Sequence, residues 1–177
     1  MMVTPCPGRS IGSRAVSGLV LRPLNDADRS WLTEFMTERW GVPLAAGGGR
    51  LHRLDALPGI VAMDGERIAG VVTYLVEGER CEIISIDAAP EGEGIGTALL
   101  EAACEAARAA GCLHVELITT NDNLRALRFY QRRGFVLSAL RPGAVDEARA
   151  LLKPQIPAVG DHGIPLRDEL VLTLSLS

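Results

Sequence analysis

The hydrophobic and polar positions repeat with two different periods along the chain. Short runs rich in branched aliphatic residues predict strands at residues 18–24, 60–63, 67–76 and 80–87. The Asp64-Gly65 pair separates two of these runs, which strongly favours a hairpin turn. We therefore expect an antiparallel meander in the middle of the chain.

Other segments have the wider spacing that is typical of helices. Residues 27–39 place Trp31, Leu32, Phe35 and Met36 on one helical stripe. Further helices are predicted at residues 95–110, 124–133 and 144–152, and further strands at 113–118, 135–141 and 169–176. The glycine-rich segment 41–59 is predicted to be a loop. A βαβ unit beside a meander indicates an α/β layered fold with a mixed sheet.

The length and composition favour one globular domain. The chain has 177 residues, of which 47% are hydrophobic and 23% are charged, and single domains commonly have about 100–200 residues. We expect a flexible leader at residues 1–17 and a single domain at 18–177. We interpret the unusually long connection at 142–167 as an insertion. It either has a functional role or covers an edge of the sheet.

Charge and cysteine content exclude several functions. Lys and Arg number 18 against 22 Asp and Glu, and aromatic residues are 4%, so a nucleic-acid partner is not expected. No apolar run approaches the roughly 18–20 residues of a membrane span, and no secretory signal begins the chain. No cysteine or histidine spacing predicts a metal site. We expect a cytoplasmic protein with four unpaired cysteines, at positions Cys6, Cys81, Cys104 and Cys112.

The segment 85–97 carries the strongest chemical signal. A predicted strand enters a turn containing Gly92, Gly94 and Gly96, and the turn opens directly into a helix. Unpaired backbone amides and the helix dipole favour a phosphate group there. A Walker A loop is excluded because no Lys follows the glycines, and a Rossmann loop is excluded because Thr97 or Leu99 occupies its third glycine position.

Two motifs together resemble those of the GNAT acetyltransferases. Residues 91–96 (EGEGIG) match the family's [QR]xxGxG loop except at the first position, and residues 123–135 (NLRALRFYQRRGF) match its NxxAxxxYxxxGF signature. The motifs occur in the family's order, separated by a helix and a strand. The resemblance covers residues 18–141 and the last strand. It implies a mixed, mostly antiparallel sheet of six or seven strands flanked by helices.

The resemblance also implies an acetyl-CoA site and no metal. The cofactor would lie between the strands at 80–88 and 113–119, with its pantetheine arm paired to the backbone of Ile86 and Ala88. Backbone amides from Gly92 to Thr97 would hold the pyrophosphate. The implied cofactor-binding residues are Ile86, Asp87, Ala88, Glu91, Gly92, Glu93, Gly94, Ile95, Gly96, Thr97, Asn123, Ala126, Phe129 and Tyr130.

Acetyl transfer to an amine needs an acid and a base. By the resemblance, Tyr130 is the acid that protonates the departing CoA thiolate, although it could instead be a core aromatic residue. Glu82 is the candidate base, with a salt-bridged strand carboxylate as the alternative. Asp87 could instead bind a cationic substrate. Neither motif contains cysteine, which favours direct attack in a ternary complex over a covalent enzyme intermediate.

The chain departs from the family at Glu91, where Gln or Arg is usual, and Glu93 adds a second carboxylate. Both are unfavourable beside a pyrophosphate unless they turn away, and Arg125, Arg128 or Arg132 could offset the charge. A non-catalytic, regulatory acetyl-CoA-binding module is therefore an alternative function. A nucleotide-binding protein is less favoured, because both nucleotide motifs fail.

The acceptor is expected to be a small-molecule or peptide amine. The segment 41–59, with Trp40, Arg50 and His52, would frame it together with the insertion, which contributes Lys153, His162 and Arg167. Nothing in the sequence identifies the amine, because substrate choice depends on loops that the sequence alone does not place. Family habit also makes a homodimer an option.

Overall fold

The computed structural model describes residues 18–89 and 94–176. The predicted leader at 1–17 and the residues Glu91, Gly92 and Glu93 lie outside this part of the chain. The strands are β1 (Leu19–Pro23), β2 (Leu44–Gly47), β3 (Arg50–Arg53), β4 (Gly59–Asp64), β5 (Arg67–Glu77), β6 (Arg80–Ala88), β7 (His114–Thr120), β8 (Val136–Arg141) and β9 (Glu169–Ser175). The α-helices are α1 (Arg29–Trp40), α2 (Ile95–Ala109), α3 (Leu124–Gln131) and α4 (Ala144–Leu151).

Seven strands form one sheet in the order β1-β4-β5-β6-β7-β9-β8. Strands β6 and β7 are parallel, and every other neighbouring pair in this sheet is antiparallel. The parallel pair requires a crossover, and α2 supplies it. The predicted mixed, mostly antiparallel sheet of six or seven strands is confirmed.

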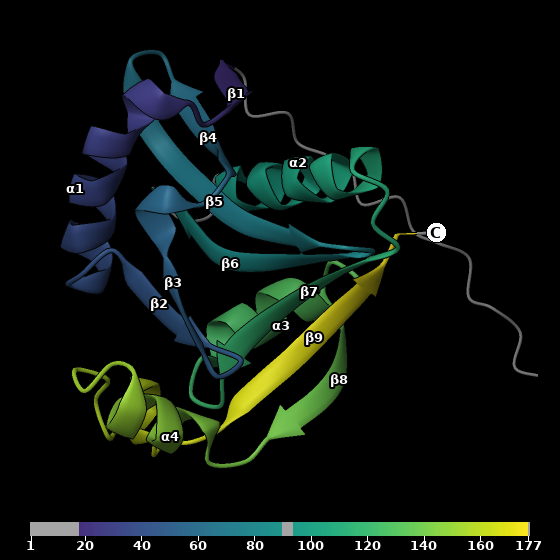
Figure 1. Cartoon of the computed structure of the whole chain (residues 1–177). Coiled ribbons are helices and arrows are strands. Elements are labelled where there is room, and N and C mark those ends of the chain that lie inside the picture. Colours follow the sequence, from purple (N-terminus) through teal and green to yellow (C-terminus); the bar gives the residue numbers. More distant parts are fainter. Residues whose placement is uncertain (1–17, 90–93, 177) are drawn as a thin grey trace, which may run out of the picture.

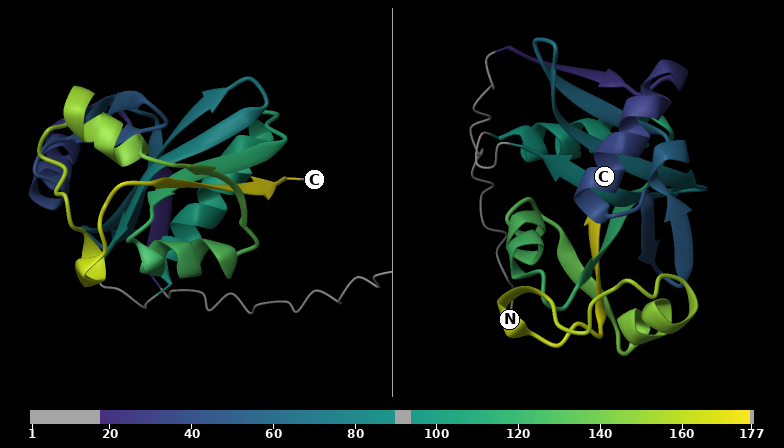
Figure 2. Two further views of the ribbon diagram at one scale, coloured as in Figure 1. Left: turned by 90° about the horizontal axis from the view of Figure 1, so that it is seen from below. Right: turned by 90° about the vertical axis from the view of Figure 1, so that its left-hand side faces the viewer.

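Helices cover both faces of the sheet (Figure 1). Helix α2 buries Leu99, Leu100, Ala103 and Ala107 in the larger core, which α3 completes with Tyr130. Helix α1 packs on the opposite face, where the smaller core contains Leu32, Met36, Ala45, Leu54 and Val71. Figure 2 shows α1 and the β2–β3 pair on the same side of the sheet. The sheet therefore separates the larger core, under α2 and α3, from the smaller core, under α1.

The prediction of a loop over residues 41–59 is wrong. Strands β2 and β3 form a separate antiparallel pair within it, with Ala45 opposite His52. Gly48 and Gly49 connect them with φ angles of 60° and 75°, and a two-residue turn with both φ angles positive is one of the types whose twist matches that of a hairpin. The Gly48-Gly49 pair is therefore a hairpin turn, and a high glycine content alone did not distinguish it from a loop.

The insertion between β8 and β9 begins with α4 and returns through an irregular segment. Asp122, just after β7, accepts a hydrogen bond from the backbone N–H of Asp161 at 2.9 Å, which ties this segment to the sheet. Strand β9 then runs between β7 and β8. This arrangement leaves β8 at the sheet edge.

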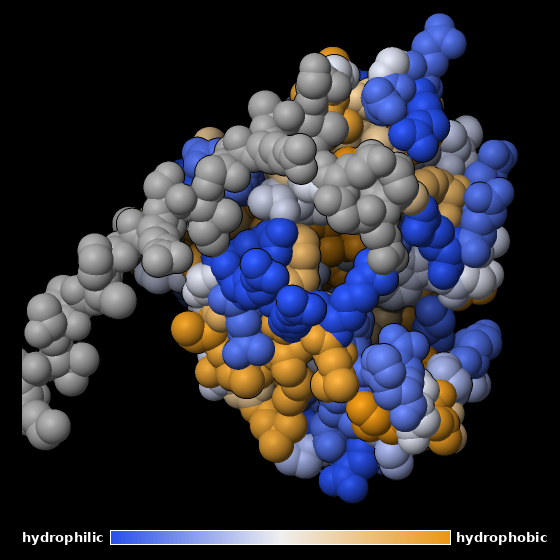
Figure 3. All heavy atoms as spheres, turned by 180° about the vertical axis from the view of Figure 1, so that it is seen from behind, coloured by the Kyte–Doolittle hydropathy of each residue, from blue (hydrophilic) through white to orange (hydrophobic). Residues whose placement is uncertain are grey.

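The edge strand β8 exposes Val136, Leu137 and Leu140. Figure 3, which views the molecule from behind, shows apolar side chains gathered at the lower left of the molecule.

Within residues 18–89 and 94–176, no helix combines the length and apolar character that crossing a membrane requires.

Candidate functional site

Strands β6 and β7 diverge after four residue pairs. Their pairing runs from Arg80 opposite His114 to Ile83 opposite Leu117. Beyond it, β6 continues paired only to β5, and β7 continues paired only to β9. A bulge at Ile84 disturbs the β5–β6 register at this point. The two strand edges that face the divergence can therefore accept an extended ligand, as predicted for the backbone of Ile86 and Ala88.

Helix α2 begins beside this divergence. Gly94 precedes the helix with a φ angle of 84°, which favours glycine, and Ile95, Gly96 and Thr97 form the first turn. A Cβ atom on Gly96 would lie 3.5 Å from the Phe129 ring. This is an ordinary contact distance, so α3 packs directly against the helix start, where free backbone amides favour an anion.

Sequence reasoning missed Arg133. Its guanidinium lies 3.7 Å from the centroid of the Phe129 ring, and its Nε donates to Thr97 Oγ1 at 3.1 Å. The arginines considered from the sequence (Arg125, Arg128 and Arg132) are exposed instead. Arg133 follows Phe129 by four residues, a spacing that places side chains on one helical face and was an available signal.

Tyr130 is buried on the α2–α3 face of the sheet. Its ring centroid lies 5.1 Å from that of Phe129 and 5.7 Å from that of Phe135. Burial, and secondarily the Asp87 carboxylate, raises the pKa of Tyr130, so the phenol keeps its proton at neutral pH. Its hydroxyl makes no hydrogen bond to any residue that the structure describes. Tyr130 is thus a core aromatic residue that also retains a free proton to donate.

The opposite face of the sheet contains a cavity of about 190 Å³, which we call the splay cavity. Strands of the hairpin, the diverging ends of β6 and β7, and the start of β9 surround it. Its lining includes both Glu82 and His52. The full lining is Trp40, Ala45, Ala46, Gly47, His52, Glu82, Ile83, Ile84, Ile118, Thr119, Thr120, Asn123 and Glu169.

Glu82, the predicted base, is only 6% exposed. Burial raises its pKa, and the Arg80 guanidinium at 3.5 Å opposes that effect. Arg80 also pairs with Glu77 and Glu116. Glu82 is therefore a salt-bridged strand carboxylate that also lines the splay cavity, and its role as the base stays a prediction.

Asp87 and Trp40 connect α1 to the diverging strand. The Trp40 Nε1–H donates to Asp87 Oδ2 at 3.1 Å, and burial raises the pKa of Asp87. Lys153 from the insertion lies 5.9 Å from the centroid of the Trp40 ring and donates to the carbonyl of Leu44 at 2.9 Å. The insertion therefore contacts Trp40, which lines the splay cavity, although Lys153 itself does not line it.

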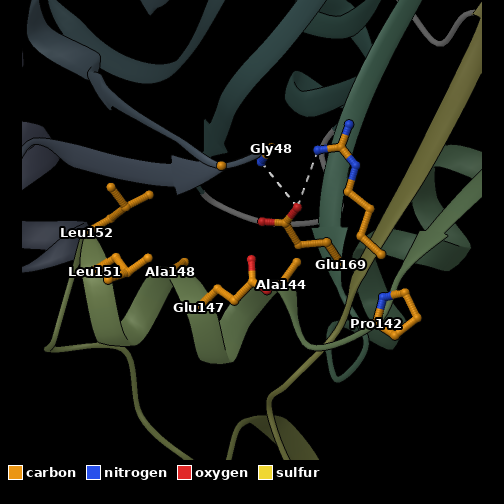
Figure 4. Close-up of a pocket in the computed structure, with 10 residues that line it drawn as sticks. Gly48, Pro142, Ala144, Glu147, Ala148, Leu151, Leu152 and Glu169 are labelled. Atoms are coloured by element: carbon orange, nitrogen blue, oxygen red, sulfur yellow. Dashed lines mark hydrogen bonds and ion pairs between the residues drawn. The ribbon is translucent and has the colours of Figure 1, made fainter.

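Glu169 also borders a second cavity of about 400 Å³, lined by Gly48, Gly49, Arg141, Pro142, Ala144, Glu147, Ala148, Leu151, Leu152 and Glu169. Figure 4 shows the buried Glu169 carboxylate pointing to the backbone of Gly48, whose N–H donates at 3.1 Å. The Nη1 atom of Arg141 lies 3.6 Å from the same carboxylate. Sequence reasoning missed Glu169, because a charged residue at a strand start looks like a surface position.

Some predicted residues lie elsewhere. Arg50 points to Glu77 in a surface ion pair, while His162 and Arg167 are exposed and line neither cavity. Asn123 lines the splay cavity, but its side-chain oxygen accepts from the Ala126 N–H at 3.0 Å and caps α3.

Three cysteines (Cys81, Cys104 and Cys112) are free and buried in the larger core. No group of three or more candidate metal ligands occurs among residues 18–89 and 94–176.

Comparison with solved structures supports the fold. A GNAT acetyltransferase from Elizabethkingia anophelis with acetyl-CoA bound has a TM-score of 0.64 and 20% identity, over 90% of this chain and 99% of that one. An acetyltransferase from Bacillus subtilis in complex with CoA has a TM-score of 0.63 and 21% identity, over 90% and 98%.

Sequence comparison identifies the family. The uncharacterized protein YdhI of Bacillus subtilis (strain 168) is 43% identical over 156 residues, which are 88% of this chain and 97% of that protein. The streptothricin acetyltransferase of Streptomyces lavendulae is 36% identical over 105 residues, 55% of each chain. Residues 23–135 match the profile of the acetyltransferase (GNAT) family. The chain therefore belongs to the GNAT family of acetyltransferases.

Proposed function

We propose that this protein is an N-acetyltransferase that moves the acetyl group of acetyl-CoA to an amine by direct attack in a ternary complex. The divergence of β6 and β7 is the observation that carries the proposal. It lies between a glycine-opened helix start and a buried acidic cavity. One ligand can thus extend between the strands while a second approaches from the cavity.

In this proposal the cofactor pairs with the backbone of Ile86 and Ala88, which belong to the unpaired edge of β6. The first turn of α2 provides amides for the pyrophosphate, and the Phe129 ring and Ala126 lie beside it. Arg133 adds a positive charge at the same place, next to Thr97. That positive charge helps the anionic cofactor to bind.

The proposed chemistry uses groups from both faces of the sheet. Glu82 attracts the acceptor's ammonium group and is a candidate to take its proton, because burial raises its pKa toward neutrality. The neutral amine attacks the thioester carbonyl, and a backbone N–H near Ile86 stabilises the oxyanion. Tyr130 donates its proton to the CoA sulfur as the C–S bond breaks.

The cavity favours a cationic acceptor. Glu82 and Glu169 are the two carboxylates in its lining, and both are more than nine-tenths buried. An ammonium group is attracted to such carboxylates more strongly than a neutral group is. The similarity to streptothricin acetyltransferase, which covers 55% of this chain, further supports a small-molecule acceptor.

Thermal unfolding with and without acetyl-CoA tests the cofactor site, with NAD and ATP as controls. Acetyl-CoA at 100 times its Kd should add about 2.7 kcal/mol, which raises the Tm of a domain of this size by roughly 5–11 °C. A shift with NAD or ATP instead would contradict the proposal.

CoA release is then measured with butylamine, putrescine, glucosamine and lysine amide as acceptors. We expect release that requires an amine. A full acetyl-CoA shift without release from any of them would favour the alternative of a non-catalytic acetyl-CoA-binding module.

A further inference from the structure

His52 carries a buried nitrogen that has no partner. The side chain lies on β3 and is 7% exposed, and its Nε2 atom makes no hydrogen bond within the described chain. A buried polar atom without a partner costs about 1–3 kcal/mol, so such atoms are rare in folded proteins. Because His52 lines the splay cavity, a ligand in that cavity can supply the missing hydrogen bond.

We propose that His52 Nε2 accepts the proton that the acceptor's ammonium group must lose before it attacks acetyl-CoA. This inference rests on the proposed function and deepens it. The ammonium N–H bond breaks and its proton moves to Nε2, which leaves a neutral amine and an imidazolium. The amine nitrogen then forms a bond to the thioester carbon. As the C–S bond breaks, the sulfur gains the proton of Tyr130, and the second proton that the nitrogen loses passes to the resulting phenolate, which restores Tyr130. The imidazolium of His52 then releases its proton to water.

The charges around His52 suit this transfer. Glu82 and Glu169 line the same cavity from β6 and β9. Arg50 and Glu77 also act on His52, in opposite directions. Arg80 lies behind Glu82, and Arg141 lies behind Glu169. Burial is the main influence and lowers the pKa of His52, so the ring is neutral at pH 7 and has a lone pair to offer.

Glu82 is a weaker candidate than His52 for accepting the proton of the ammonium group. Its carboxylate already has a charge partner in Arg80, whereas His52 Nε2 has none. We therefore assign charge attraction to Glu82 and proton transfer to His52. The assignment requires the tautomer with its proton on Nδ1, because only that form leaves a lone pair on Nε2.

The kinetic test compares His52→Gln with Glu82→Gln and with the control His162→Gln, whose side chain is exposed and lines neither cavity. We expect His52→Gln to lower kcat by about 10²–10⁴-fold and to lose the acid-side inflection of the kcat–pH profile. Glu82→Gln should mainly raise the KM of the amine and keep that inflection. A His52→Gln kcat within threefold of wild type, with the inflection intact, would overturn the assignment.

Chemical rescue provides a second variant. In His52→Ala the enlarged cavity can admit free imidazole, which should restore turnover in proportion to its concentration and basicity. The acetyl-CoA-induced rise in Tm shows that each variant is folded. A folded His52→Ala protein that imidazole does not accelerate, while retaining wild-type kcat, would exclude His52 as the proton acceptor.

A measurement that does not depend on enzyme turnover tests the role of His52 separately from the proposed function. Nitrogen NMR shifts of the three histidines report their tautomers, and His52 should be neutral with its proton on Nδ1 at pH 7. A proton on Nε2, or a charged ring, would refute the assignment. Wild-type protein that releases no CoA with any amine would instead count against the proposed function.

Discussion

The substitution Tyr130→Phe separates catalysis from packing in this protein. It removes one oxygen and its proton, and it leaves the ring contacts with Phe129 and Phe135 in place. The hydroxyl makes no hydrogen bond within the described residues, so we expect little change in folding stability. If the phenol protonates the CoA sulfur, kcat should fall by about 10²–10⁴-fold, equivalent to about 2.7–5.4 kcal/mol of transition-state stabilisation.

The measurement is steady-state CoA release at saturating amine, together with the acetyl-CoA-induced rise in Tm. Tyr74→Phe is the matched control, since Tyr74 is the other of the two tyrosines. Burial also raises the pKa of Tyr74, but it packs against the core from β5 and lines neither cavity. We expect wild-type turnover from the control and an unchanged Tm shift from both variants.

A Tyr130→Phe kcat within threefold of wild type would refute the acid role and leave Tyr130 as a core residue. A lost acetyl-CoA shift would show that the hydroxyl serves binding. Either result contradicts the reasoning from burial and the missing hydrogen bond.

Two further predictions concern stability. In Gly70→Ala the added Cβ would lie 2.5 Å from the backbone oxygen of Asp87 and 2.9 Å from a methyl group of Leu99. We expect a loss of about 1–3 kcal/mol and weaker acetyl-CoA binding, because β6 must shift; an unchanged Tm and Kd would contradict this. Asp28 accepts two hydrogen bonds from Arg22, at 2.6 and 2.7 Å, and this pair is the main reason that its pKa is far below the ordinary 3.8. The contribution of Asp28 is therefore present above about pH 4 and is lost as the pH falls further. Asp28→Asn should cost about 1–3 kcal/mol in urea unfolding at pH 7, and the difference from wild type should shrink below pH 4; a pH-independent difference would contradict the linkage.

The two faces of the sheet explain why acid and base groups need not touch. Tyr130 belongs to the larger core under α2 and α3, whereas Glu82 and His52 line a cavity on the α1 and hairpin face. The divergence of β6 and β7 offers a route between them. A thioester placed there could meet the amine from one side and the phenol from the other.

The sequence by itself determined most element types (the β2–β3 hairpin was missed), the glycine-opened helix and the family. These features depend on residues close together along the chain, such as the 3.6-residue stripe of α2 and the two motifs at 91–96 and 123–135. It also indicated Tyr130 from its position in the second motif, and Glu82 as a carboxylate on the predicted strand 80–87. The sequence did not show that the Glu82 and Tyr130 side chains are buried, or which residues they contact.

Only the tertiary structure decided how distant strands combine. Strand β9 runs between β7 and β8, which brings Glu169 opposite both Thr120 and Arg141 and beside the hairpin turn at Gly48. The hairpin in turn brings His52 to the cavity that Glu82 lines. Local periodicity specifies which face of a strand is apolar, but the choice of pairing partner depends on packing across the whole core. For that reason the placement of His52 and Glu169 in one cavity with Glu82 could be seen only in the folded chain, although the sequence had already suggested that His52 lies near the acceptor.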